Sequence, residues 1–114
     1  MPENPAHATE VRDLYTKFDA VFFEKTRLSI ITLLYRDKEI SFNQLKEALG
    51  ASDGGLYAHL EKLRQAGYVD RQKAIIENSI SSQYFLTLLG KTRFREYVEF
   101  LASVVNAHTE KESS

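Results

Sequence analysis

Residues 41–67 constrain the fold most, because they predict two short helices with only two residues between them. The first helix is bounded at both ends. Ser41 and Gln44 have the spacing of a capping box, in which each side chain bonds the other residue's backbone N–H, so a helix should begin at about residue 42. Gly50 should end it at about residue 49, because glycine readily takes the left-handed conformation in which helices terminate. The chain must then turn sharply.

The second helix of this segment carries one apolar stripe. Leu56, Leu60 and Leu63 are spaced i, i+4, i+7, which places them on one helix face. Ser52 is a suitable N-cap, and Gly67 is a second terminating glycine. Two short helices joined by a tight turn form a helix-turn-helix unit, to which we assign the bounds 41–67.

Two helices are expected before this unit. Residues 9–23 have apolar side chains at helical spacing, with a break expected near Asp19. These side chains are Val11, Leu14, Phe18, Val21 and Phe22. Residues 24–37 are apolar nearly all round, which indicates a helix that neighbours cover on several sides. This second helix should form the centre of the core.

The apolar period changes after the helix-turn-helix. Residues 68–87 interleave β-branched and aromatic side chains with polar ones, which predicts a β-hairpin or wing with its turn near residues 77–79. Thr87 should cap a last helix over about 88–107. The predicted fold class is mainly α with a small β-hairpin, arranged as a single winged helix-turn-helix domain over residues 1–114.

Composition narrows the classes of function. A chain of 114 residues suits one domain, and the absence of cysteine excludes disulfides, thiolate metal sites and cysteine nucleophiles. No segment has the ~20 apolar residues that cross a bilayer, so we expect a cytoplasmic protein without a membrane partner. The three histidines are scattered, and glycine-rich phosphate loops and H-E-x-x-H motifs are absent. We therefore expect no enzyme, no cofactor and no metal.

Charge is unevenly distributed along the chain, although the net charge is only −1. Residues 59–95 carry seven basic and three acidic side chains, whereas residues 1–24 carry two and five, and residues 96–114 carry one and four. A basic centre of this kind can present a local positive field to a polyanion. The alternative is that charge simply fluctuates by a few units along any chain.

Three segments resemble a known family. They are "EKTRLSIITLL", "ISFNQLKEALGASDGGLYAHLEKLRQAGYV" and "YFLTLLGKTRFREYVEFL". Together they are similar to the winged-helix transcriptional regulators related to the MarR and ArsR families, over roughly residues 24–100, and "HLEKLRQAGYV" is the most specific part. The resemblance implies a homodimeric regulator of double-stranded DNA, in which the helix containing His59 enters the major groove.

The second helix of the helix-turn-helix opens on two glycines, which suits a close approach to DNA. In a helix-turn-helix the N-terminal part of the second helix approaches the base edges, and Gly54 and Gly55 would clear space there. Each glycine costs ~1 kcal/mol relative to alanine inside a helix. The alternative is that they let this helix pack closely on the preceding one.

Candidates for DNA contact follow the outer arc of this helix and the hairpin. Tyr57, Ala58 and His59 are candidates for direct readout, whereas Lys62 and Arg64 should meet phosphates. On the hairpin, basic side chains two residues apart share one strand face. The full set is Ser52, Asp53, Gly54, Gly55, Tyr57, Ala58, His59, Lys62, Arg64, Arg71, Lys73 and Gln83.

Two of the readout candidates, Tyr57 and His59, also have a structural alternative. Tyr57 can be a plain surface aromatic, and His59 can be a half-buried ring bonded to a backbone carbonyl. The hairpin tip carries no basic residue, so either minor-groove entry or a solvated ribbon is consistent with the sequence.

The terminal helices predict a homodimer, because their apolar stripe is wider than one helix of a small domain needs. The residues assigned to this dimer interface are Leu14, Phe18, Phe22, Phe94, Tyr97, Val98, Leu101, Val104 and Val105. Alternatively, the last helix only closes the core of its own chain. A different function also stays open, that of a winged-helix module that binds a protein and does not contact DNA. The sequence identifies no small-molecule effector.

Overall fold

A computed structural model describes residues 20–113 of the chain, and the side chains of residues 20–107. In chain order the elements are α2 (Lys25–Asp37), β1 (Glu39–Ser41), α3 (Phe42–Leu49), α4 (Asp53–Gln65), β2 (Val69–Ile76), β3 (Ser79–Leu86) and α5 (Leu88–Ser113). The helix expected over residues 9–23 lies mostly outside the described residues. Its last part, residues 20–23, forms turns and a bend instead of helix.

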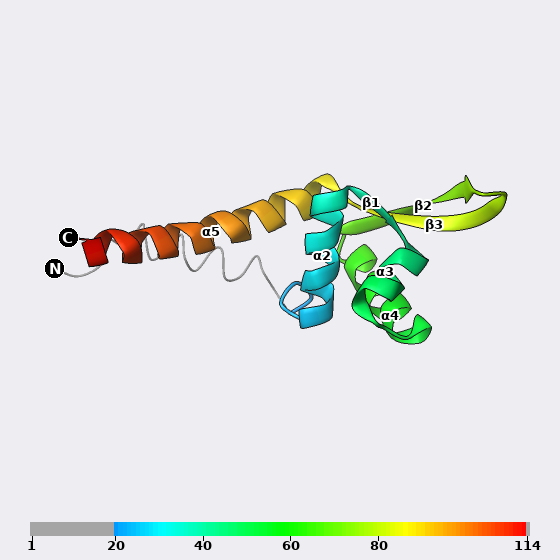
Figure 1. Cartoon of the computed structure of the whole chain (residues 1–114), viewed down its shortest axis with the longest axis horizontal. Coiled ribbons are helices and arrows are strands. Elements are labelled where there is room, and N and C mark those ends of the chain that lie inside the picture. Colours follow the sequence, from blue (N-terminus) through cyan, green and yellow to red (C-terminus); the bar gives the residue numbers. More distant parts are fainter. Residues whose placement is uncertain (1–19, 114) are drawn as a thin grey trace.

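The elements form a small body from which two parts project. Figure 1 shows α2, α3 and α4 gathered beside the sheet, with α5 extending to one side and the β2–β3 hairpin to the other. The turn between α3 and α4 lies toward the same end of the molecule as the hairpin tip (Figure 1). The helix α5 therefore projects away from the turn of the helix-turn-helix, whereas the hairpin projects toward the same end of the molecule as that turn.

The residues that were expected to start and end α3 and α4 all lie at the ends of these helices. Ser41 and Gln44 form the complete capping box, and Gly50 ends α3 in the left-handed conformation with φ 61°. Ser52 caps α4 by accepting the N–H of Gly55 at 3.1 Å. Gly67 follows the end of α4 with φ 84°. The predicted helix-turn-helix is therefore confirmed with its ends in place.

The sheet contains one strand that the sequence did not predict. Its three strands are antiparallel in the order β1-β3-β2, and β1 contributes only three residues, with Ile40 opposite Tyr84. The hairpin itself is as expected. Its turn consists of Glu77 and Asn78, both left-handed with φ 51° and 65°, as a two-residue type I′ turn requires.

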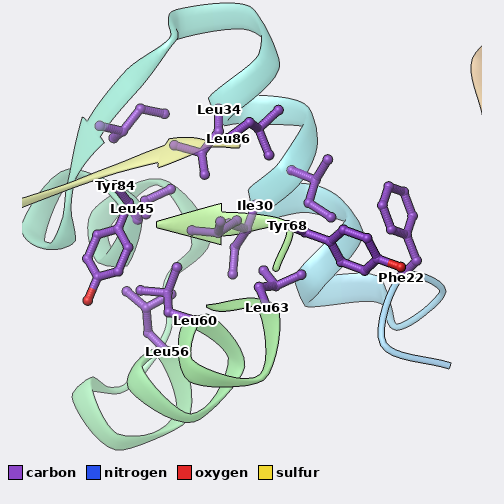
Figure 2. Close-up of a cluster of buried hydrophobic side chains, with 13 residues drawn as sticks. Phe22, Ile30, Leu34, Leu45, Leu56, Leu60, Leu63, Tyr68, Tyr84 and Leu86 are labelled. Atoms are coloured by element: carbon purple, nitrogen blue, oxygen red, sulfur yellow. The ribbon is translucent and has the colours of Figure 1, made fainter. Parts of the chain in front are cut away.

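The core lies between α2, α4 and the sheet. Figure 2 shows its side chains converging, and they come from every described element except α5. The buried apolar residues are Phe22, Ile30, Ile31, Leu34, Ile40, Leu45, Leu56, Leu60, Leu63, Tyr68, Val69, Tyr84 and Leu86.

Phe22 requires a correction, because the sequence assigned it to a dimer interface. The ring is fully buried and packs edge-to-face on Tyr68, with 5.2 Å between the ring centroids. It presents no surface to a second chain. Its apolar character is explained by the core of its own domain, where it closes the end of the cluster (Figure 2).

The first turn of α5 is fixed to the end of α4. Thr87 caps α5 by accepting the N–H of Gly90 at 3.0 Å, and its hydroxyl donates to the carbonyl of Gly67 at 2.6 Å. Gly90 is buried, and a Cβ placed there would lie 2.1 Å from the carbonyl oxygen of Tyr68. Glycine is needed here because the helix backbone directly contacts the chain that leaves α4.

Candidate nucleic-acid interface

One side of α4 is buried and the other is exposed. Leu56, Leu60 and Leu63 are completely buried, as the i, i+4, i+7 stripe predicted. Tyr57 is 48% exposed, and Ala58 is exposed beside it. The first turn is exposed as well. The outward side of α4 is therefore free, within the described part of the chain, to meet a large partner.

The two glycines of α4 have different environments. A Cβ on Gly54 would have no heavy atom within 4 Å, so close packing on α3 does not explain this glycine. A Cβ on Gly55 would lie 2.9 Å from Oγ of Ser52, so the N-cap gives Gly55 a local reason. Gly54 is thus an exposed helix glycine that costs stability and serves no contact in the described structure.

Asp53 begins α4 and carries a negative charge in its exposed first turn. Its carboxylate pairs with Nζ of Lys46 on α3 at 2.8 Å. Both side chains are well exposed, so the pair adds little to stability. The pair brings a positive charge next to the carboxylate of Asp53 in the first turn of α4.

Basic side chains continue this surface along the hairpin. Arg71 and Lys73 are exposed on one face of β2. A hydrogen bond with the hydroxyl of Tyr84 raises the pKa of Arg71, and Arg71 also interacts electrostatically with Glu61 and Tyr57 of α4. The exposed flank of α4 and this face of the hairpin therefore lie near each other, and together they are named here the α4–β2 surface.

Arg64 is less available than the sequence suggested. Its Nη1 bonds the carboxylate oxygens of Glu61 at 2.9 and 3.0 Å, and its Nε lies 3.7 Å from Oδ1 of Asp70. The hydrogen bond with Glu61 is the main reason why the pKa of Arg64 is raised. Arg64 therefore stabilises the end of α4 within its own chain.

Gln83 requires a correction, because the sequence placed it among the DNA contacts. It lies in the central strand β3 between Ser41 of β1 and Gln72 of β2, and it is 6% exposed. Its Nε2 donates to Oγ of Ser81 at 3.2 Å. A side chain enclosed in this way cannot reach DNA.

His59 is half-buried and contacts a residue that the sequence did not single out. Its Nδ1 lies 3.0 Å from Nη1 of Arg27 and 3.6 Å from Oε2 of Glu24. The half-buried alternative for His59 is therefore correct in burial, although the partner is a guanidinium and not a backbone carbonyl. The only sequence signal for Arg27 was an arginine inside a helix that is otherwise apolar nearly all round.

Glu24 completes this cluster at the start of α2. Burial alone would raise the pKa of Glu24, but hydrogen bonds from the backbone N–H groups of Arg27 and Thr26, with electrostatic interactions with His59 and Arg27, lower it below the ordinary value. Glu24 is thus the ionised N-cap of α2, where a negative charge is favoured by the helix dipole.

The apolar stripe of α5 divides into two parts. Phe94 and Tyr97 are half-buried against their own chain, where Phe94 packs at a tilt on Tyr35 and Tyr97 packs edge-to-face on Phe23, with centroids 5.0 and 5.4 Å apart. For these two residues, closure of the core explains the apolar character. Further along α5 the stripe is exposed. Its residues are Val98 (44%), Leu101 (43%), Val104 (51%) and Val105 (60%), and Leu14 and Phe18 lie outside the described residues.

The described residues give little support for other kinds of site. The hairpin tip exposes Ile75, Ile76 and Ile80 and carries no basic side chain. Within residues 20–113, no helix is long and apolar enough to cross a membrane. The described side chains also include no group of three or more metal-ligating residues.

These features define a winged-helix protein, in which a helix-turn-helix is followed by a two-stranded wing. Residues 26–105 match the family described as winged helix DNA-binding domain, and the chain belongs to that family. The resemblance to winged-helix transcriptional regulators is confirmed. The chain is also 35% identical over 78 residues to the uncharacterized protein MJ0432 of Methanocaldococcus jannaschii, a match that covers 68% of this chain and 85% of that protein.

Solved structures share the fold at low sequence identity. The transcriptional regulator homologue from Pyrococcus horikoshii OT3 aligns with a TM-score of 0.72 at 20% identity, over 87% of this chain and 96% of that chain. A MarR-family regulator from Enterococcus faecalis V583 gives 0.68 at 18%, over 99% and 96%. The S. aureus MepR–DNA complex gives 0.71 at 13%, over 95% and 89%. The fold is that of transcription regulators.

Proposed function

We propose that the chain is a homodimeric transcriptional regulator that binds double-stranded DNA with α4 in the major groove. The observation that carries this proposal is Gly54. It is an exposed glycine in the first turn of α4 that no packing contact requires, and it lies where a helix-turn-helix comes closest to base edges. A bare backbone at this position allows the helix to enter the groove more deeply.

The side chains around Gly54 suit base contact. Tyr57 offers a hydroxyl and an aromatic face, and Ala58 offers a methyl group that can touch the methyl of thymine. Lys62 is exposed further along α4 and can reach a phosphate. Ser52 and Gly55 supply the N-cap, and the α4–β2 surface extends the contact to the phosphate backbone.

The exposed stripe on α5 supports the dimer. Every residue from 101 to 107 is exposed, and the aliphatic side chains among them continue the stripe at helical spacing. A second copy that covers the same stripe would bury both around a two-fold axis. Two reading helices would then address half-sites about one DNA turn apart, ~34 Å. One of the solved structures with this fold, that of MepR, is a complex with DNA.

The test is a titration of genomic DNA fragments followed by electrophoretic mobility shift at several salt concentrations. The proposal predicts that some fragments are retained, and that the logarithm of the binding constant falls linearly with the logarithm of the salt concentration. Retention of no fragment, or an affinity that does not respond to salt, would contradict it.

Replacement of Gly54 by leucine separates stability from binding. Gly54→Leu should keep or raise the free energy of unfolding, by up to about 1 kcal/mol, because leucine is a better helix former and the site is open. DNA binding should fall at least about tenfold, since the side chain would occupy the space against the bases. Thermal unfolding and DNA titration of the same sample measure both effects. Unchanged DNA affinity in a stably folded variant would remove the main support for the proposal.

The basic side chains of the wing should act through charge and not through base identity. Arg71→Gln and Lys73→Gln should each weaken binding to all sequences similarly and reduce the salt slope by about 1. Arg36→Gln is the matched control, because Arg36 is exposed at the C-terminal end of α2 and pairs with Asp37. Titrations at four or five salt concentrations give the slopes. Equal slopes for wild type, wing variants and control would place the wing away from DNA.

A further inference from the structure

The guanidinium of Arg27 joins three parts of the molecule. Arg27 lies in the first turn of α2 and is 7% exposed. Its Nε donates to the carbonyl of Val21 at 2.7 Å, and its Nη2 donates to the carbonyl of Ala20 at 3.1 Å. Its Nη1 lies 3.0 Å from Nδ1 of His59 on α4. One buried side chain therefore ties the segment that enters α2 to the helix proposed to read DNA.

This contact determines which ring nitrogen of His59 carries the proton. Arginine has N–H donors and no acceptor, so Nδ1 must accept from Nη1 of Arg27, and the proton of the neutral ring then resides on Nε2. Glu24 lies 3.6 Å from the same Nδ1 and would favour a proton there. The contact with Arg27 is the shorter one, and a proton on Nδ1 would set two N–H groups against each other. Arg27 is therefore the partner that decides the tautomer.

Arginine is the side chain that this position requires. A buried charge is costly unless hydrogen bonds compensate it, and the guanidinium makes three contacts in three directions. Lysine carries its three donors on one nitrogen at the end of a flexible stem, so it lacks the rigid fork in which Nε, Nη1 and Nη2 each meet a different acceptor. The guanidinium therefore holds three separate groups in fixed positions relative to one another.

We propose that Arg27 is a positioning residue for DNA recognition, which holds α4 against the start of α2 and fixes His59 as a neutral Nε2–H donor. This inference rests on the function proposed above. The side chain of His59 is 28% exposed, so the ring is accessible from one side. A fixed donor selects acceptors, such as a phosphate oxygen or the N7 and O6 of guanine, and disfavours a base edge that offers only a donor.

The tautomer is tested directly by ¹⁵N NMR of the full chain with labelled histidine, at neutral pH and without DNA. His59→Asn identifies the signals of His59 by their loss. The proposal predicts a bare Nδ1 and a protonated Nε2 in the wild type, and a mixture of tautomers in Arg27→Gln. A proton on Nδ1 in the wild type, or an identical His59 spectrum in Arg27→Gln, would overturn it.

DNA titration tests the functional part. Arg27→Gln and His59→Asn should each lower affinity about fivefold, the effect of one hydrogen bond, and the double variant should lose no more than the weaker-binding single variant. Arg36→Gln is the control and should bind as the wild type does. Arg27→Gln removes buried hydrogen bonds and can unfold the chain. His59→Asn, which keeps a side-chain oxygen for Arg27, carries the test in that case.

The outcomes separate this inference from the proposed function. If the wild type retains no DNA, both fail. If the wild type binds DNA and folded His59→Asn binds it equally well, the proposed function stands and only the positioning role is overturned. Additive losses in the double variant would also overturn it, because independent effects would show that Arg27 does not act through His59.

Discussion

A chain that carries Leu101→Asp and Val104→Asp should be a folded monomer that binds DNA at least about 100-fold more weakly than the wild type. Both residues are about half exposed on α5, so carboxylates there cost little in the isolated chain. In a dimer the same carboxylates would be buried without partners, which is strongly unfavourable. A monomer engages one half-site, and loss of the linked second half-site removes a factor of about 10²–10⁴ in affinity.

The matched control places the same two charges on another side of α5. Ser103→Asp with Asn106→Asp has the same spacing, and both residues are exposed. Sedimentation velocity should show a dimer for this control and for the wild type, and a monomer for the Leu101 and Val104 variant. A Leu101 and Val104 variant that stays dimeric, or a wild type that is monomeric at the concentrations where it binds DNA, would contradict the assignment of this stripe.

Gly90→Ala should destabilise the fold by about 3 kcal/mol, because overpacking against a rigid backbone is among the costliest single changes. The new Cβ would lie 2.1 Å from the carbonyl oxygen of Tyr68. The backbones of Gly90 and Tyr68 cannot move apart without breaking the hydrogen bonds of Thr87. The midpoint of thermal unfolding should fall by roughly 10 °C or more.

Gly54→Ala is the control for Gly90→Ala, since the same added methyl group meets open space there. This control should raise stability by up to about 1 kcal/mol. Differential scanning calorimetry of the three proteins measures the difference. If Gly90→Ala unfolds at the wild-type temperature, α5 is not fixed to the end of α4 by the close contact at Tyr68.

The helix-turn-helix was predictable because its boundaries depend on neighbouring residues. Ser41, Gly50 and Ser52 act within one helical turn of their own position, so sequence spacing alone revealed them. Strand β1 could not be predicted in this way. It is three residues long and exists as a strand only because β3, more than forty residues later, pairs with it.

The candidate site was predicted in part. The exposure of Tyr57 and Ala58 followed from the leucine stripe of α4, and the structure adds that Gly54 has no packing role. The contact between Arg27 and His59 joins residues 32 positions apart, so no local sequence pattern predicts it. Gln83 was misplaced because alternation identifies a strand without showing that the strand is central and covered on both edges.

The most direct test of the central claim is selection of bound duplexes from a random DNA pool, followed by methylation interference on the selected site. Guanine N7 lies in the major groove, so methylation there blocks a helix that reads that groove. The account predicts a two-fold symmetric sequence with interference at two clusters about one turn, ~34 Å, apart. Enrichment of no sequence, or a bound site indifferent to N7 methylation, would contradict it.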